Sequence, residues 1–345
     1  MALSVRLALE LANRSSLNIC FESIVIGVII FFTVVGNTFV CCAVWRNQRL
    51  RTISNMFVVA LAISDSLMGI LCMPFVFGTL IEGRWLFGDA FCRVHGFTGF
   101  TLALVSIHTM SLIAVNRFYC IVKPSKYQNL FRSSRTRIYI LIVWLFAFVG
   151  SVPPFLLDDG GYSFHPGKGM CLYTFESNLV YTIFIEVAYI GCPLLLISFC
   201  YSSVFKEVYR TNKVFVPNQM AVDQLRVNVQ ETKITKTLAI VFLGFSICWL
   251  PASIIDTLGA FYGQPRFKRE VYLTYTFMAY LSSLINPIIY GITSRGFRRE
   301  YKAMLKGLTC HVLWKRNNFH HGQSTTFQES QMEAWQQSRP VEVQG

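Results

Sequence analysis

Seven stretches of this 345-residue chain are each long and apolar enough to cross a lipid bilayer. A crossing needs about 20 predominantly apolar residues, and lipid offers the backbone no hydrogen-bond partners outside the segment. Each stretch must therefore be an α-helix. The sequence predicts an all-α membrane protein, a seven-transmembrane helix bundle, with spans near residues 23–45, 54–77, 91–121, 137–157, 178–206, 233–259 and 271–292.

The net charge of +13 follows from membrane topology, so we expect no nucleic-acid partner. Basic residues gather in alternate loops, which face the cytoplasm, and acids such as Glu82 and Asp89 lie in the opposite loops. We expect a multi-pass protein of the plasma membrane, with an extracellular N-terminus and a cytoplasmic C-terminus. The last outer loop is an exception, because it carries the basic residues Arg266, Lys268 and Arg269. These charges would lie at a pocket mouth. The basic residues of the inner loops are Arg46, Arg49, Arg51, Lys123, Lys126, Arg132, Arg135, Arg137, Arg295, Arg298, Arg299, Lys302 and Lys306.

The remaining segments flank the transmembrane domain of residues 23–292. Residues 1–22 form an extracellular N-terminus without a convincing signal peptide, because Arg6 and Glu10 interrupt its apolar run. Asn13 opens a glycosylation sequon, a pattern that also occurs by chance. Residues 293–306 mix apolar and basic side chains, as a short amphipathic eighth helix on a lipid surface does.

The polar, Gln-rich tail of residues 307–345 is expected to be cytoplasmic and disordered. Within it, Cys310 is either a palmitoylation site or an ordinary cytosolic thiol. Phosphorylation of the tail would add negative charge that a regulatory partner can bind, and the available hydroxyls are Ser324, Thr325, Thr326 and Ser330.

Cys92 and Cys171 differ from the other nine cysteines, most of which lie in spans as small apolar residues. Cys92 opens the third span on the outer side and Cys171 lies in the second outer loop. Both face an oxidising compartment, so we expect a disulfide that holds this loop over the third span. The alternative is two free thiols.

Polar residues at one depth indicate a hydrated site inside the bundle. Asp65 lies in the middle of the second span, where a lone carboxylate is costly and usually functional. Either it belongs to a pocket that holds a cation and changes between states, or it is a protonated acid bonded to its neighbours. The polar residues at similar depth are Asn37, Ser106, Ser282 and Asn286.

Arg117 and Glu231 lie at the inner ends of the third and sixth spans. An ion pair between them would join these helix ends and, once broken, release the sixth helix outward. The alternative is that Arg117 reaches lipid headgroups and Glu231 is solvated. Prolines bend four of the spans, and Trp249 lies beside one of these bends with Phe245 one turn away. These prolines are Pro153, Pro154, Pro193, Pro251 and Pro287.

Two other classes of membrane protein lack support. A transporter or channel would show inverted repeats and Gly-rich broken helices, which we do not find. An intramembrane enzyme would need paired Asp residues, a metal-binding His-Glu spacing or a Ser/His set at one depth, and none is present. We therefore expect a protein without catalytic activity.

Taken together, these motifs resemble those of the rhodopsin-like (class A) G-protein-coupled receptors, from about Asn37 to Tyr301. The matching motifs are Gly36-Asn37, Leu61-Ala62-Ile63-Ser64-Asp65, Trp85 with Phe87-Gly88, the Cys92 and Cys171 pair, Asn116-Arg117-Phe118, Trp144, Pro193 with Tyr201, Phe245 with Cys248-Trp249-Leu250-Pro251, Asn286-Pro287-Ile288-Ile289-Tyr290, and Phe297-Arg298-Arg299.

The resemblance implies roles for particular residues. Arg117, Tyr201 and Tyr290 would line the crevice that receives a heterotrimeric G protein, and Asp65 with Ser106 would hold an allosteric sodium ion. No other cofactor is implied. An arrestin, a receptor kinase, membrane lipids and a small-molecule ligand are the further partners. The switch residues would be Asn116, Arg117, Tyr201, Glu231, Phe245, Trp249, Asn286, Pro287 and Tyr290.

Within that family the scaffold looks most like melatonin receptors, in stretches such as 44–47, 55–59 and 278–280 and in Asn116-Arg117. The pocket departs from their pattern: Tyr189 replaces a His, Pro154 an Asn and Pro287 an Ala. Ser125 in the second inner loop is small, which favours an inhibitory (Gi/o) protein.

The expected pocket is mostly apolar and aromatic and suits a small ligand. Gly99 stands where amine receptors carry their Asp, and Tyr280 stands where opsins carry their retinal-binding Lys, so neither an ordinary monoamine receptor nor a photoreceptor is expected. Glu186 either contacts a cationic ligand or is structural, and a peptide ligand stays open. The expected pocket residues are Gly99, Phe100, Ala103, Glu186, Tyr189, Trp249, Ala252 and Tyr280.

Overall fold

The computed structural model describes residues 3–156, 161–175, 177–212, 219–262 and 267–307. Two units divide the chain, Met1–Phe297 and Arg298–Gly345. The first contains the helical bundle. Of the second, residues 298–307 are described, and they are helical as the end of a helix over 295–307. Several sequence predictions lie outside the described residues: the tail beyond 307 with Cys310 and its hydroxyls, and Arg266 of the last outer loop.

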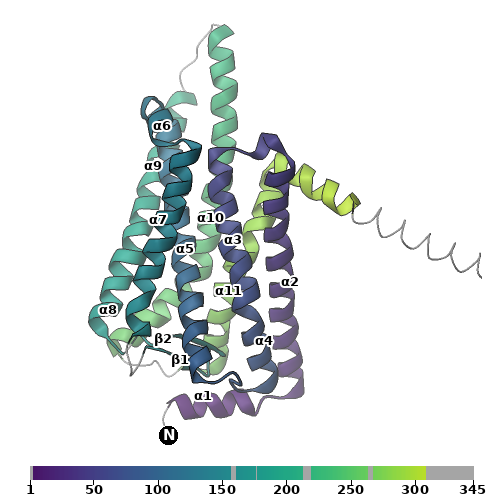
Figure 1. Cartoon of the computed structure of the whole chain (residues 1–345), viewed down its shortest axis with the longest axis vertical. Coiled ribbons are helices and arrows are strands. Elements are labelled where there is room, and N and C mark those ends of the chain that lie inside the picture. Colours follow the sequence, from purple (N-terminus) through teal and green to yellow (C-terminus); the bar gives the residue numbers. More distant parts are fainter. Residues whose placement is uncertain (1–2, 157–160, 176, 213–218, 263–266, 308–345) are drawn as a thin grey trace, which may run out of the picture. The chain divides into compact units, whose positions relative to one another are not determined.

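Long helices make up the bundle (Figure 1), and six described segments are long and apolar enough to cross a membrane. These are Ser16–Arg46, Ile53–Glu82, Asp89–Val122, Ser133–Phe155, Leu179–Arg210 and Glu231–Gly259. The seventh long helix, α11 (Arg269–Thr293), carries more Tyr, Ser and Thr than the others and packs between α10 (Gln219–Tyr262) and α2 (Ser16–Arg46). The predicted all-α seven-helix bundle is confirmed, and the polar composition of α11 fits its largely buried position.

α5 (Asp89–Val122) is the central helix of the bundle. It packs against α3 (Ile53–Leu71), α7 (Ser133–Phe155), α9 (Cys192–Asn212) and α10. Sixteen of its residues are buried, which is why its hydrophobic residues show no single apolar face. Two short helices lie at one end of the bundle: η1 (Gln48–Leu50) and α6 (Pro124–Leu130).

Two of the predicted spans are irregular, each at a proline. The second span divides into α3 and α4 (Met73–Glu82) at Cys72, two residues before Pro74. The fifth consists of α8 (Leu179–Phe184), a π-helical turn η2 (Ile185–Gly191) and α9, with Pro193 following the turn. The proline ring cannot sit against the carbonyl four residues earlier, so the turn before it widens.

The other end of the bundle is covered by two segments. A hairpin of β1 (Tyr162–His165) and β2 (Met170–Tyr173) pairs Tyr162 with Tyr173 and Phe164 with Cys171. α1 (Leu3–Ala12) lies across the same end beside the hairpin (Figure 1). The predicted extracellular N-terminus of residues 1–22 contains α1 and the start of α2 at Ser16, and Leu7 and Leu11 of α1 have apolar partners in the bundle.

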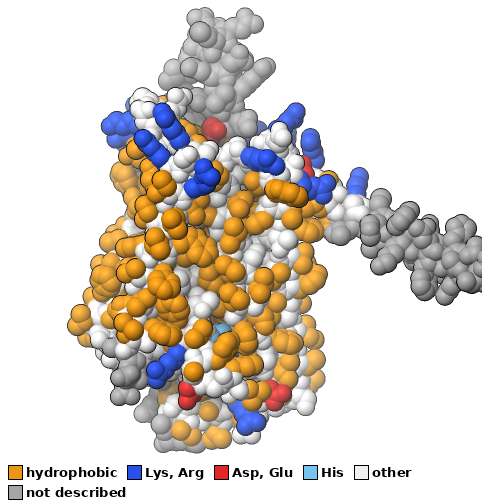
Figure 2. Space-filling model, in the orientation of Figure 1, with side chains coloured by type: hydrophobic (Ala, Val, Ile, Leu, Met, Phe, Trp, Pro, Cys, Tyr) orange, Lys and Arg blue, Asp and Glu red, His pale blue; other side chains and the backbone are white. Residues whose placement is uncertain are grey.

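The surface of the bundle carries a broad belt of exposed apolar side chains (Figure 2). Leu17, Val180 and Leu195 are more than 70% exposed, a pattern that only a lipid environment makes favourable. Exposed basic residues such as Arg49, Lys126 and Arg135 lie at the end of the bundle with η1 and α6. We call this the basic end, and the opposite one, with the hairpin, the disulfide end.

Residues 207–232 separate the fifth and sixth predicted spans and carry many polar side chains. The structure extends α9 to Asn212 and begins α10 at Gln219, so most of this segment is helical. Its polar composition hid this from hydropathy, which detects burial in lipid and not helix formation itself.

Candidate functional site: a cavity and an ion pair on the same helices

A cavity of about 590 Å³ lies inside the bundle between α5, η2, α9, α10 and α11. The hairpin forms its roof through Met170, Cys171, Leu172 and Tyr173. Most of the lining is apolar or aromatic, which is the usual character of a small-molecule site. Six of the predicted pocket residues line it: Gly99, Phe100, Ala103, Glu186, Trp249 and Tyr280.

Two predicted pocket residues do not line the cavity. Tyr189 points away from it and stacks on Phe146 of α7 with ring centroids 4.3 Å apart, with His108 5.5 Å away. The cause is the π-helical turn, which shifts the rotation of the residues after Glu186 relative to a regular α-helix. Ala252 is buried instead in an apolar cluster with Leu7 of α1 and Tyr272 of α11.

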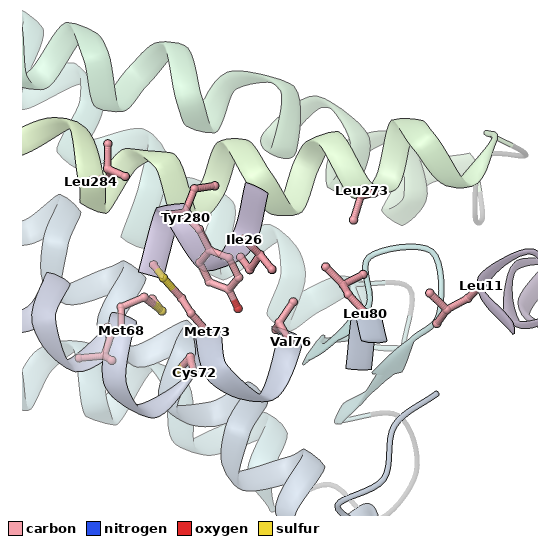
Figure 3. Close-up of a cluster of buried hydrophobic side chains, with 12 residues drawn as sticks. Leu11, Ile26, Met68, Cys72, Met73, Val76, Leu80, Leu273, Tyr280 and Leu284 are labelled. Carbon is pink, nitrogen blue, oxygen red and sulfur yellow. The ribbon is translucent and has the colours of Figure 1, made fainter. Parts of the chain in front are cut away.

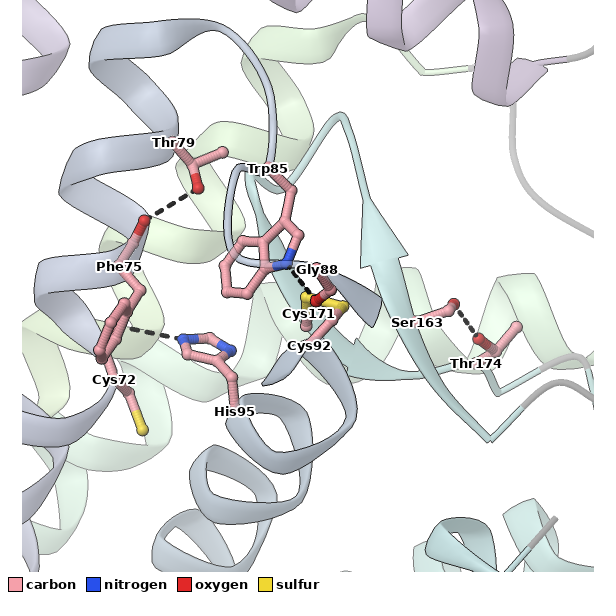
Figure 4. Close-up of a disulfide and its surroundings, with 10 residues drawn as sticks. All are labelled: Cys72, Phe75, Thr79, Trp85, Gly88, Cys92, His95, Ser163, Cys171 and Thr174. Atoms are coloured by element: carbon pink, nitrogen blue, oxygen red, sulfur yellow. Dashed lines mark hydrogen bonds between the residues drawn. A yellow bond between two sulfur atoms is a disulfide. The ribbon is translucent and has the colours of Figure 1, made fainter. Parts of the chain in front are cut away.

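The roof of the cavity is held by a disulfide, as predicted. Cys92 at the start of α5 is bonded to Cys171 of β2, with their Cα atoms 5.4 Å apart (Figure 4). Nearby, the Trp85 indole donates to the carbonyl of Gly88 at 2.9 Å, and the ring of His95 contacts the carbonyl of Cys72 at the break between α3 and α4. The hairpin is thereby fixed to α5 at the disulfide end of the bundle.

Lys168, which the sequence analysis did not single out, also fixes the hairpin. Its Nζ lies 2.7 Å from Asp256 Oδ1 and 3.8 Å from the centroid of the Tyr275 ring. The Tyr275 hydroxyl donates to the other oxygen of Asp256 at 2.8 Å, and Thr276 donates to the Lys168 carbonyl at 2.7 Å. Nothing in the pattern of the sequence marked Lys168, because it reaches Asp256 from 88 residues away.

His165 lies in the same hairpin, outside the membrane-spanning segments. Its ring accepts a hydrogen bond from the Lys168 backbone N–H at 3.2 Å and lies 4.8 Å from the Tyr272 ring. Burial, together with the positive charge of Lys168, lowers the pKa of His165 to about 3. The imidazole is therefore neutral at physiological pH.

α1 is attached to the bundle through buried charges. Glu22 of α2 forms ion pairs with both Arg14 and Arg269, and all three side chains are almost fully buried. Arg6 donates to the Phe267 carbonyl at 2.7 Å. We expected Arg269 to be a loop charge at a pocket mouth, but it is neutralised inside this cluster. Asn13, the residue of the sequon, is exposed between α1 and α2.

Leu11 of α1 also joins an apolar cluster toward the disulfide end of the bundle (Figure 3). Tyr280 belongs to the same cluster through its ring. Its hydroxyl is buried and has no hydrogen-bond partner among the described residues. Leu80 and Val76 of α4 complete the contact between α1, α2 and α11.

Between the cavity and the basic end, several of the predicted polar residues lie close together. Asn286 Nδ2 donates to Asp65 Oδ2 at 2.8 Å, and Asn37 Nδ2 donates to the Ser283 carbonyl at 3.0 Å. Ser106 Oγ lies 3.3 Å from Ser64 Oγ. The Oδ1 atoms of Asn37 and Asn286 are buried acceptors without a donor in the described part of the chain. A buried carboxylate with unpaired amide oxygens nearby is a donor set that fits a hard cation such as sodium.

Trp249 connects this polar region with the cavity that it lines. Its Nε1 donates to Ser282 Oγ at 3.0 Å, and Ser282 donates to the Ala279 carbonyl. The Phe245 ring lies one turn away, with centroids 5.8 Å apart. Pro287 of α11 packs so close to α2 that a Cβ added to Gly36 would lie 3.0 Å from it.

At the basic end, Arg117 and Glu231 form the predicted ion pair, with Nη1 2.6 Å from Oε2. Arg117 is 1% exposed and Glu231 is 32% exposed. Arg117 also donates to Asn116 Oδ1 at 2.6 Å and to Ser54. Because Asn116 is neutral, Glu231 is the carboxylate that pairs with Arg117 in the described structure.

Two further predicted switch residues, Tyr201 and Tyr290, are also buried. Tyr201 of α9 is buried, with its ring 6.2 Å from that of Phe242 in α10. Tyr290 is buried and stacks on Phe297 at 5.5 Å. In α6, Tyr127 contacts Asn116 at 3.4 Å, and burial raises the pKa of the Tyr127 hydroxyl above its ordinary value.

Comparisons with known proteins agree with this geometry. The profile of the family described as "7 transmembrane receptor (rhodopsin family)" matches residues 36–290. The mouse melatonin receptor type 1B is 30% identical over 274 residues, which cover 79% of this chain and 74% of that protein. The melatonin receptor type 1A of Phodopus sungorus is 30% identical over 287 residues, covering 81% and 80%.

A solved structure shares the architecture. The crystal structure of squid rhodopsin matches with a TM-score of 0.71 and 25% identity, over 84% of this chain and 86% of that one. The family consists of receptors that act through G proteins on binding a ligand, and it is not a family of enzymes. The chain therefore belongs to the rhodopsin family of seven-transmembrane receptors, with similarity to melatonin receptors.

Proposed function

We propose that this receptor binds a small extracellular ligand in the cavity and inhibits adenylate cyclase through a Gi/o protein. The observation that supports this most directly is the Arg117–Glu231 pair, which joins α5 and α10, two helices that also line the cavity. Glu231 is partly exposed, so water weakens the pair and a ligand needs only modest differential binding to reverse it.

In this proposal Trp249 and Phe245 transmit ligand binding to α10, near the bend at Pro251. Sodium bound by Asp65 and Ser106 would favour one of the two states. The basic end, with Tyr201, Asn286 and Tyr290 behind it, would receive the G protein and later an arrestin after phosphorylation by a receptor kinase. The N-terminus would be extracellular, since the basic end faces the cytoplasm by the charge rule.

Two matched variants at the ion pair provide the test. Glu231→Gln removes the carboxylate but keeps Arg117 for the G protein, so we expect forskolin-stimulated cAMP to fall without ligand. Arg117→Ala removes the ion pair and the arginine together, so it should not lower cAMP. The proposal is wrong if surface-expressed Glu231→Gln leaves cAMP unchanged, or if pertussis toxin, which disables Gi/o proteins, leaves its effect intact.

Melatonin is the first ligand to apply, because the similar curated receptors are named for it. A melatonin-dependent fall in cAMP that Arg117→Ala loses would support a melatonin-type receptor. Tyr189 and Pro154 depart from the melatonin pattern, and the structure turns Tyr189 away from the cavity, so the ligand itself needs a separate argument.

A further inference from the structure

Of the two acidic side chains that line the cavity, one has partners and the other has none among the described residues. Among its lining residues only Glu186 and Asp256 are charged. Asp256 has both of its oxygens occupied, one by the ammonium of Lys168 and one by the hydroxyl of Tyr275. Glu186 has no hydrogen-bond or ion-pair partner among the described residues. Two carboxyl groups and one ammonium leave Glu186 as the unpaired acidic side chain of the cavity.

The backbone itself directs Glu186 into this space. Glu186 is the second residue of the π-helical turn, and Ile190, Gly191 and Leu194 line the cavity on the same side. Asp256 of α10 lines the same cavity. π-helical turns often occur at functional sites, because they change which side chains a helix presents to a pocket.

Asp256, which lines the cavity, already binds one ammonium group, that of Lys168. It lies between a carboxylate oxygen and the face of an aromatic ring, a combination of ion pair and cation–π contact. The lining of the cavity that contains Glu186 also includes aromatic side chains that can cover a cation and an apolar body. These are Phe100, Tyr173, Phe175 and Trp249.

We propose that the cavity binds an amphiphilic monocation, an ammonium group on an aromatic or aliphatic body, with Glu186 as its counter-ion. The proposal rests on the ligand-binding function proposed above and names the class of ligand. A neutral ligand would remove water from Glu186 without replacing its interactions, which is costly. A dication would find only one unpaired carboxylate, since Lys168 occupies Asp256.

A pair of probes that differ in charge tests this. 5-Methoxytryptamine is a protonated amine at neutral pH, and melatonin is its neutral N-acetyl derivative. Binding to the full-length receptor in detergent would be measured by thermal stabilisation up to millimolar concentration. We expect the amine to bind more tightly than melatonin. Glu186→Gln should weaken binding of the amine by roughly thirtyfold and change the affinity for melatonin less than twofold.

Glu270→Gln is the matched control, because Glu270 is an exposed carboxylate at the same end of the bundle and does not line the cavity. It should leave both affinities unchanged. Tighter binding of melatonin than of the amine, amine binding that survives Glu186→Gln, or no stabilisation by the amine would each overturn the proposal. The Glu231→Gln cAMP assay needs no ligand. A negative result in the binding experiment therefore leaves the proposed signalling function standing, and a negative cAMP result leaves the proposed class of ligand standing.

Discussion

At the scale of single residues, buried charges decide how the disulfide end is built. Lys168 and Asp256 are 4% and 9% exposed, so their ion pair has little water around it. A buried pair adds little net stability compared with apolar residues, but removing one partner leaves the other charge without compensation. The pair therefore determines where the hairpin sits, and with it the roof of the cavity.

Lys168→Met is expected to lower the free energy of unfolding by about 3 kcal/mol, because Asp256 loses its counter-ion inside the protein. Thermal unfolding of the purified receptor in detergent measures this. The double variant Lys168→Met with Asp256→Leu removes both charges and should recover most of the loss. A single variant as stable as the natural chain would show that the pair is not needed to hold the hairpin.

At the scale of elements, α1 shows how a short amphipathic helix becomes part of a membrane bundle. Leu7 and Leu11 are buried while Leu9 on the opposite face is 45% exposed. The helix end lies so close to Gly83 that a Cβ there would meet the Ala12 Cα at 3.1 Å, and the positive φ of Gly83 also favours glycine. α1 is thus packed onto the bundle and does not extend into solvent.

Leu7→Ala and Leu9→Ala form a matched pair on this helix. Leu7→Ala removes buried methyl groups and is expected to weaken docking of α1 by about 2 kcal/mol or more. Amide hydrogen exchange over residues 3–12 should then become faster, with little change elsewhere. Leu9→Ala, on the exposed face, should leave exchange as it is. Equal effects of the two substitutions would contradict the docked position of α1.

The hairpin gives a prediction about pH. The pKa of His165 is about 3 in the folded protein, against about 6.5 in an unfolded chain. Folding therefore excludes a proton, so this stabilisation is complete above pH 6.5 and is lost as the pH falls toward 3. At pH 5 the loss is about 2 kcal/mol.

His165→Gln removes this titration. Between pH 7 and pH 5 the melting temperature of the variant should therefore fall less than that of the natural chain. Comparing the two proteins cancels the titration of other groups. A difference that stays constant over this range would mean that His165 is protonated as easily in the folded state as in the unfolded one.

At the scale of the whole molecule, the apolar belt and the basic end predict orientation in the membrane. Asn13 lies at the disulfide end and Arg295 follows α11 at the other. If the N-terminus is extracellular, Asn13 is available for glycosylation. We expect glycosidase treatment to increase the gel mobility of the natural chain expressed in animal cells. Asn13→Gln should migrate like the treated protein. A tag after Gly345 that is accessible on intact cells would contradict this orientation.

Hydropathy and motif spacing alone were sufficient for the seven-helix fold, the family and the Cys92–Cys171 disulfide. The fold follows because each span must satisfy its own backbone hydrogen bonds in lipid. The family and the disulfide follow because each motif residue has a fixed position in a particular span or loop. The same reasoning anticipated the Arg117–Glu231 contact, since both residues lie at the same end of their helices.

The composition of the pocket wall depended on the tertiary structure. The family resemblance placed Tyr189 and Ala252 in the cavity, but the π-helical turn rotated the first away and α1 covered the second. Lys168 pairs with Asp256 across 88 residues, and Glu22 pairs with Arg269 across 247. Such pairings depend on how helices rotate and how loops fold back over them, and local sequence patterns carry no information about either.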